Sequence, residues 1–440
     1  MTLIEGEEES TSLGEASASN PRSAATGPLG FFWRLRALEA FNYREFRLLW
    51  SGHVFVSMAF WMDQVTRGWL IYEMTDSTVQ LGLVRGVQAI PILFLSPLAG
   101  SVADRYSRKF QIVLTQVTNG VIYAVLALLI FTGRIETWHV YVTAVLVSIS
   151  ETFHQPARAA IIADAVPRNR LSNAIGLNST IFNLARSTGP ALAGVLIASV
   201  GTGSAFAVQA GFYFLATFWT TQLRAQNQNA ERKSLTAHKQ SSFRQNIVEG
   251  WKFSWRNETV RTGLIVTMLA SLFIVPFVTL LPAFARDILG VGAKGQGVLL
   301  TAMGIGALAS ALVIASFGDR MPRGLFMLGG LAVYGLGVAG FALSPWFGLS
   351  LGLMVVIGFT NVCSHALVQT VIQTYSPAEF RGRVMSIFQQ SQVVMTGGSM
   401  MIGSLAAMCG ASWATVLMAG AGVLSVIGIH LMLPAACKIR

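Results

Sequence analysis

The sequence predicts an all-α, polytopic membrane protein with about 12 transmembrane helices in two pseudo-symmetric six-helix bundles. Of its 440 residues, 53% are hydrophobic and only 12% are charged, whereas a soluble domain carries about 25% charged residues. Apolar runs of the roughly 20 residues needed to cross a bilayer recur about a dozen times along the chain. Related segments also return half a chain apart, which indicates duplication. These observations exclude a soluble fold.

The apolar runs place the helices, with boundaries loose by a few residues. We expect spans at about 47–72, 79–102, 110–131, 138–160, 174–199, 203–222, 260–284, 296–317, 325–343, 347–371, 384–408 and 412–434. The expected organisation is a disordered cytoplasmic tail at 1–42, an N-terminal bundle at 43–222, a cytoplasmic linker at 223–258, a C-terminal bundle at 259–435 and a cytoplasmic tail at 436–440. In the linker, Phe243, Ile247, Trp251 and Trp255 fall four residues apart, which favours an amphipathic helix on the membrane surface.

Basic residues collect on one side of this arrangement. All but six of the 31 Lys and Arg residues fall in the segments that share a side with the N-terminus or at the helix ends that adjoin those segments. Three lie in segments of the other side (Arg134, Arg286 and Lys294) and three lie inside helices (Arg67, Arg85 and Arg186). By the positive-inside rule, both termini are expected in the cytoplasm of a bacterium, with the chain in its inner membrane. The net charge of +11 therefore reflects topology, and no nucleic-acid partner is expected.

Two loop sequences repeat half a chain apart. Residues Asp104, Arg105 and Arg108 follow the second expected helix, and Asp319, Arg320 and Arg323 follow the eighth, at an offset of 215. Pro167 and Arg170 after the fourth helix match Pro377 and Arg381 after the tenth. Repeats of this kind fit a duplicated six-helix unit.

The segment from Gly100 to Lys109 resembles the loop signature of the major facilitator superfamily. The stretches 42–50, 61–62 and 183–194 are similar to the branch that contains the enterobactin exporter and relatives called transmembrane secretion effectors. This resemblance implies the major facilitator fold of two related halves and secondary transport by alternating access.

The resemblance also implies a gate at the cytoplasmic face. In the family, the loop Asp reaches a helix N-terminus or an Arg of the opposite half when this gate is closed, and such a contact contributes about 0.3–1 kcal/mol. The residues expected to act in this way are Asp104, Arg105, Arg108, Asp319, Arg320 and Arg323, with Arg381 and Arg383 as partners. The alternative is that these charges only set the topology.

The fifth helix contains Gly189, Pro190 and Gly194. This segment is similar to the antiporter-type motif of facilitator exporters, although Ala185 and Ala193 stand where that motif has glycine, and it implies export. The alternative is ordinary close packing through small residues.

Charged residues inside the membrane cost about 2.5–3.5 kcal/mol near its centre, so each one needs a role. Glu151 and Arg186 lie on adjacent expected helices and are expected to pair, either as a structural ion pair or as a proton-exchanging site. Asp63 is a second candidate for proton coupling. Arg67 is four residues from Asp63, near enough to the outer boundary to snorkel towards water.

A polar stripe marks the tenth helix, where Asn361, His365 and Gln369 are spaced by four. A stripe of this kind must face protein or water, and the resemblance places helices one, four, seven and ten around a central cavity. Substrate-cavity candidates are therefore Arg67, Gln155, Asn361, His365 and Gln369. A lone histidine such as His365 is more often a hydrogen-bonding residue without a substrate role.

The leading hypothesis is proton-coupled efflux of a small amphipathic molecule, drug-like or siderophore-like, by a monomer. A lysophospholipid flippase or an importer of the same fold is one alternative, and a non-transporting membrane sensor or scaffold is another. No enzyme is expected, because the sequence lacks a phosphate loop, a His-Glu-x-x-His motif and a Gly-x-Ser-x-Gly motif. No cofactor or metal is expected, and the proton gradient is the expected energy source.

Overall fold

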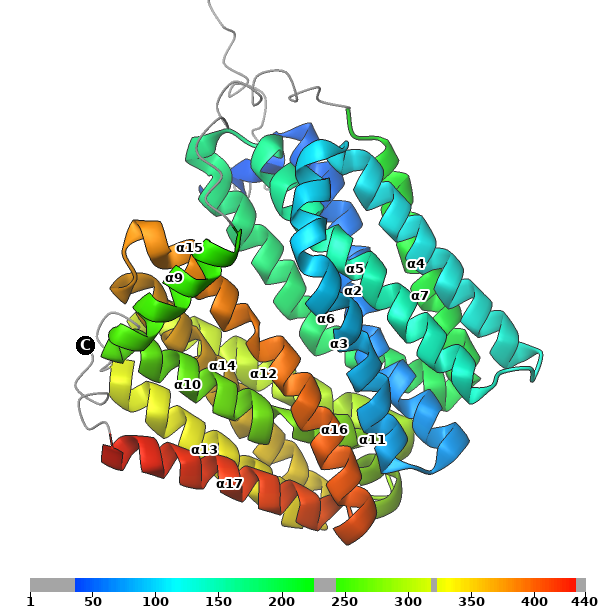
Figure 1. Ribbon diagram of the computed structural model, residues 1–440. Coiled ribbons are helices and arrows are strands. Elements are labelled where there is room, and N and C mark those ends of the chain that lie inside the picture. Colours follow the sequence, from blue (N-terminus) through cyan, green and yellow to red (C-terminus); the bar gives the residue numbers. More distant parts are fainter. Residues whose placement is uncertain (1–35, 225–242, 318–322, 433–440) are drawn as a thin grey trace, which may run out of the picture.

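The computed structural model describes residues 36–224, 243–317 and 323–432, and within these ranges all regular secondary structure is helical. Figure 1 shows two groups of long helices inclined to one another. Nine of the described helical segments are long and apolar enough to cross a membrane by length and composition. The predicted all-α membrane fold is therefore confirmed.

The N-terminal half consists of six long helices. They are α2 (Arg44–Thr75), α3 (Thr78–Arg105), α4 (Arg108–Phe131), α5 (Thr137–Ala165), α6 (Leu171–Val200) and α7 (Thr202–Thr221). The short 3-10 helices η2 (Arg36–Asn42) and η3 (Arg168–Arg170) lie at the entries to α2 and α6. Helices α2, α5 and α7 are long enough to cross a membrane but are more polar than the nine segments counted above. Helix α2 carries a buried ion pair, which accounts for part of its polarity.

The C-terminal half repeats this plan after the linker helix α9 (Phe243–Arg256). Its first span comprises α10 (Glu258–Phe273), η4 (Val275–Leu280), α11 (Leu281–Ala283) and η5 (Phe284–Ile288). The others are α12 (Gly292–Phe317), α13 (Arg323–Leu343), α14 (Phe347–Tyr375), α15 (Ala378–Gln389) with α16 (Ser391–Cys409), and α17 (Ala411–Met432). The turns Gly201 and Gly410, at φ 94° and 84°, occupy matching places in the two halves and need glycine because φ is positive.

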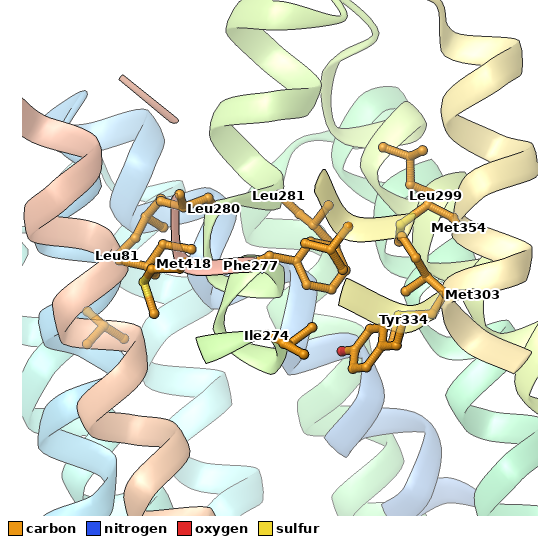
Figure 2. Packing of buried hydrophobic residues seen from close by; sticks show 14 of the residues in the cluster. Leu81, Ile274, Phe277, Leu280, Leu281, Leu299, Met303, Tyr334, Met354 and Met418 are labelled. Atoms are coloured by element: carbon orange, nitrogen blue, oxygen red, sulfur yellow. The ribbon is translucent and has the colours of Figure 1, made fainter. Parts of the chain in front are cut away.

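The first span of the C-terminal half is broken, although the sequence predicted a continuous helix at 260–284. Pro276 and Pro282 each lack the N–H that a continuing α-helix would use, so the chain passes through 3-10, α and π turns. Figure 2 shows Phe277 of this segment among buried residues, and most of the labelled ones belong to the C-terminal half. Its ring lies 5.9 Å from that of Phe341.

The two halves have two distinct ends. We call the end that carries η2, η3, α9 and α15 the linker end, and the end that carries Asp76, Gly201 and Gly410 the loop end. The main contacts between the halves run along α6 with α12 and α3 with α16. In Figure 1 the two groups of helices approach each other near α2, α11 and α16 and spread apart towards the linker end.

The segment expected to be a disordered tail is ordered from Arg36 onward. The backbone N–H of Ala40 donates to Oδ1 of Asn173 at 2.9 Å, and Glu39 forms an ion pair with Arg170. Ala40 is fully buried beside Phe46 and Val166. These contacts with α6 hold η2 in place, so the expected boundary at residue 42 is corrected, and residues 1–35 lie outside the described part.

The linker contains a helix at the expected position. Helix α9 packs on α15, where Phe253 stacks on Phe380 at 4.9 Å and Glu249 accepts from Arg383 at 2.5 Å. Trp251 and Trp255 are exposed, with their rings 6.1 Å apart. The helix therefore presents an aromatic edge away from the bundle.

Candidate functional site

A cavity of about 520 Å³ lies in the linker-end part of the N-terminal half. Such a volume suits a small molecule. Its walls come from α2, α5 and α6, and its polar lining residues are His53, Gln155, Arg158, Asn178, Ser179 and Asn183. No Asp or Glu is among the described residues that line it. The cavity therefore has amide and cationic walls.

Arg158 is one of the lining residues that the sequence did not single out, because it was counted among the basic residues near the cytoplasm. Its Nη2 donates to Oδ1 of Asn178 at 3.2 Å. Behind it lies a second pocket of about 10 Å³, lined in part by Gln116 and His154, which offers room for about one water molecule. Within the described residues, Nε2 of His154 is buried and has no hydrogen-bond partner.

Glu151 faces away from the cavity, into the bundle. Its Oε1 accepts from Nδ2 of Asn119 at 2.9 Å and from the hydroxyl of Tyr213 at 3.1 Å. Both hydrogen bonds come from neutral side chains, on α4 and α7. Asn119 and Tyr213 were missed in the sequence because nothing in the spacing of those helices marks them as partners of an acid.

The expected pair between Glu151 and Arg186 is wrong. Arg186 turns towards the C-terminal half, where its Nη2 donates to Oδ1 of Asn361 at 3.4 Å. Its guanidinium also lies over the ring of Trp61, 5.4 Å from the centroid. The prediction failed because adjacency of two helices does not fix their rotation about their own axes, and α5 and α6 turn these residues to different sides.

Asp63 and Arg67 form the pair whose spacing on one helix face was noted. Arg67 Nε lies 3.1 Å from Asp63 Oδ2, and Nη2 lies 3.1 Å from Oδ1. Arg67 also donates to the carbonyl of Val140 at 3.3 Å and to Thr143 at 3.1 Å, and it is 1% exposed. Two expectations are therefore corrected: Arg67 neither snorkels nor lines the cavity, because its side chain is buried inside the half, where it pairs with Asp63.

The other cavity candidates divide between the two halves. Gln155 lines the cavity described above. On α14, Asn361 and Gln369 are partly exposed and His365 is exposed, with its ring 5.1 Å from that of Phe388. The polar stripe therefore faces open space for part of its length.

The described gate residues bind within their own halves. Arg108 pairs with Asp164, Arg383 pairs with Glu249, and Arg381 donates to the carbonyl of Ser376 at 3.5 Å. The side chains of Asp104, Arg105 and Arg323 lie outside the described part, as do Asp319 and Arg320 entirely. Among the described residues, Arg108, Arg381 and Arg383 thus form no ion pair or hydrogen bond between the halves in this conformation.

The loop end, by contrast, is tied together across the halves. Tyr72 donates to Asp287 and Arg286 pairs with Asp76. Thr78 also donates to the carbonyl of Gly403 at 3.0 Å. The adjacent charges Arg286 and Asp287, in an otherwise apolar region, were the sequence signal that could have revealed this cluster.

The helix-five motif packs α6 against both halves. A Cβ at Gly189 would lie 2.9 Å from Cβ of Trp61 on α2. At Gly194 it would lie 2.6 Å from the carbonyl oxygen of Ala293 on α12, and Gly297 in turn meets the carbonyl oxygen of Pro190. The motif therefore permits a close approach of the two backbones between the halves.

Comparison with known proteins supplies the family. The profile of the family described as transmembrane secretion effector matches residues 36–438. The multidrug efflux pump Tap of Mycolicibacterium fortuitum is 26% identical over 72% of this chain and 78% of its own length. The staphyloferrin A transporter of Staphylococcus aureus is 24% identical over 81% of this chain and 88% of its own length.

Solved structures share the fold at low sequence identity. The nucleoside transporter NupG superimposes with a TM-score of 0.68 at 15% identity, covering 88% of this chain and 98% of its own. A bacterial homologue of the lysosomal transporter Spinster, in an inward-facing and unoccupied conformation, gives a TM-score of 0.67 at 14% identity, covering 92% and 97%. At this identity the likeness extends to the fold alone.

Proposed function

This chain belongs to the transmembrane secretion effector family of major facilitator transporters, and we propose that it exports a small amphipathic molecule from the cytoplasm in exchange for protons. The observation that carries the proposal is the asymmetry of the two ends. The loop end is tied across the halves, whereas the linker end contains a polar cavity of about 520 Å³. This arrangement supports one state of an alternating-access cycle.

Direction and topology follow from independent arguments. The basic residues of the linker end favour a cytoplasmic location for it, so the cavity would load from the cytoplasm of a bacterial cell. Tap is named a multidrug efflux pump, and a relative from Streptococcus pyogenes is named a macrolide efflux protein. These names support export over import.

Glu151 is the carboxylate that best suits proton exchange. Asp63 is paired with Arg67 in full burial, so neutralising it would leave a buried guanidinium unpaired, at high cost. Glu151 accepts from the neutral donors Asn119 and Tyr213, which tolerate either protonation state of the acid better than a bound cation would. His154 and Arg158, on the same helix, line the small pocket that lies next to the cavity, and one water there would shorten the path for a proton.

The test uses everted membrane vesicles whose interior is acidified and whose pH gradient is read with a dye. A macrolide, a siderophore and a lysophospholipid are added to wild type, to Glu151→Gln and to Glu258→Gln, an exposed carboxylate at the linker end that serves as control. We expect one compound to discharge the gradient through wild type and Glu258→Gln but not through Glu151→Gln. If the compound discharged the pH gradient equally through wild type and Glu151→Gln, Glu151 would not be the residue that exchanges protons. Movement of the compound without protons would replace exchange by uniport or lipid flipping.

A further inference from the structure

Arg186 carries a charge that the described protein does not balance. It lies near the middle of α6, within a membrane-spanning segment, and is only partly exposed. Its polar contact is the neutral amide oxygen of Asn361, at the long distance of 3.4 Å, together with the ring of Trp61. Among the described residues, no carboxylate oxygen lies within the 4.0 Å that defines an ion pair with its guanidinium. A charge held in the membrane without a counter-ion is costly and marks a functional site.

Arg67 provides the comparison inside the same half. It is equally confined to the membrane region, and it has both oxygens of Asp63 within 3.1 Å. The fold can therefore give an intramembrane arginine a carboxylate partner. Arg186 lacks such a partner on the side that faces the other half.

The surroundings of Arg186 suit an anion. Phe182 and Asn183, one helical turn closer to the linker end, line the large cavity, and the polar residues there are amides, the hydroxyl of Ser179, the imidazole of His53 and the cation Arg158. The stripe on α14 adds neutral Asn361 and Gln369. A cationic ligand would meet like charge in these walls, whereas an oxyanion would gain charge-assisted hydrogen bonds from the fork of a guanidinium.

The position of Arg186 also connects binding to movement. Its hydrogen bond to Asn361 joins α6 of the N-terminal half to α14 of the C-terminal half. A carboxylate that binds the guanidinium would compete with the Asn361 amide for the same donor. Occupancy of the site would therefore change a contact between the halves, which is what a ligand must do to shift an alternating-access equilibrium.

We infer that Arg186, one helical turn beyond the lining of the cavity, binds an anion, and that the exported molecule is an amphipathic oxyanion whose charged group docks between Arg186 and Asn361 while its apolar part lies along Phe182, which lines the cavity. The inference rests on the proposed transport function, but not on proton coupling. The anionic group is a carboxylate or a lipid-like phosphate, and the two are separated by experiment.

The test is equilibrium binding to the purified full-length chain in detergent, without any gradient. Dodecanoate, dodecyl phosphate, dodecanol and dodecylamine share one apolar chain and differ in the charge of the head group. We expect one of the two anions to bind at least about tenfold more tightly than dodecanol and dodecylamine, which corresponds to the replacement of a neutral contact by a charge-assisted one. The preferred anion identifies the head group.

Variants assign the preference to Arg186. Arg186→Gln should lose the tenfold advantage of the anion while binding dodecanol as before, which also shows that it is folded. Arg186→Lys should retain part of the advantage, and Arg134→Gln, an exposed arginine at the loop end, should retain all of it. Equal binding of all four compounds, tighter binding of dodecylamine, or an unchanged preference in Arg186→Gln would overturn the inference. Failure of proton-coupled export in vesicles would leave this binding result unaffected, and failure of anion binding would leave export of another molecule possible.

Discussion

Gly194 on α6 and Gly297 on α12 cross so closely that a Cβ on either would lie 2.6 Å from a backbone oxygen of the opposite helix. Gly82 on α3 and Gly403 on α16 form the corresponding crossing, where a Cβ on either would again lie 2.6 Å from a backbone oxygen. The two crossings lie on the two long interfaces between the halves. The backbones of the two halves approach each other closely at both crossings, and the Thr78 hydroxyl donates to the carbonyl of Gly403 at the second one, so both crossings would have to loosen for the loop end to open.

A larger residue at the crossing should therefore prevent tight closure of the loop end. Gly194→Val is expected to slow transport strongly and to destabilise this conformation by about 1–3 kcal/mol, the usual cost of overpacking. Transport rate and thermal stability measure the effect. Gly176→Val is the matched control, because it lies on the same helix and its Cβ would meet no atom within 4 Å. Equal behaviour of the two variants would show that the crossing is not a constraint.

The accessibility of α6 should differ along its length. Ser179 is exposed and lines the cavity, whereas Ser187 is buried and touches Gly304 of α12. In a background without native cysteines, Ser179→Cys should react with a membrane-impermeant maleimide in everted vesicles but not in intact cells. Ser187→Cys should react slowly in both. Labelling of Ser179→Cys from outside intact cells would place the cavity on the wrong side of the membrane.

The charged cluster at the loop end should bias the equilibrium only weakly. The pair of Asp76 and Arg286 is partly exposed, and pairs of that kind contribute about 0.2–1 kcal/mol. Arg286→Gln should therefore raise the ratio of molecules with an open loop end to molecules with a closed loop end by no more than about fivefold. The double variant with Asp76→Asn should add little to Arg286→Gln, because the pair of Asp76 with Arg286 is already lost in that single variant. High salt should reproduce part of the effect in wild type, and additive single effects would show that the two residues act separately.

Asp63 should prove structural. Asp63→Asn leaves the buried guanidinium of Arg67 without its counter-ion, which typically costs about 3–5 kcal/mol. The expected result is loss of folded protein, read by size-exclusion chromatography and thermal unfolding. The double variant Asp63→Leu with Arg67→Met should recover folding, because it removes both charges. A well-folded Asp63→Asn that lacks only proton exchange would return Asp63 to the coupling role.

Helix positions could be predicted closely from the sequence, because apolar length and turn residues act locally. The expected span at 110–131 corresponds to α4 (Arg108–Phe131), and the span at 203–222 to α7 (Thr202–Thr221). The broken first span of the C-terminal half was missed, although Pro276 and Pro282 were the available signal. A proline inside an apolar run is compatible with either a kink or a complete change of helix type, and packing decides between them.

The site was predicted less well, because it depends on how helices rotate against each other. The four-residue spacing of Asp63 and Arg67 fixes a shared face within one helix, and the two residues do pair. Partners on different helices, such as Asn119 and Tyr213 for Glu151, follow from rotations that no local pattern encodes. Arg158 shows the same limit, since its place near the end of an apolar run suggested a topological charge and its side chain lines the cavity.

The most direct test of alternating access is a pair of distances measured by double electron–electron resonance on the full-length chain with its three native cysteines replaced by serine. One label pair, Arg168→Cys and Thr374→Cys, spans the two halves at the linker end. The other pair, Thr132→Cys and Trp346→Cys, spans them at the loop end. All four positions are exposed. On addition of dodecanoate or on a change of pH, the linker-end distance should shorten as the loop-end distance lengthens. Distances that change in the same sense, or that stay fixed while the ligand binds, would contradict a transporter that opens its two ends in turn.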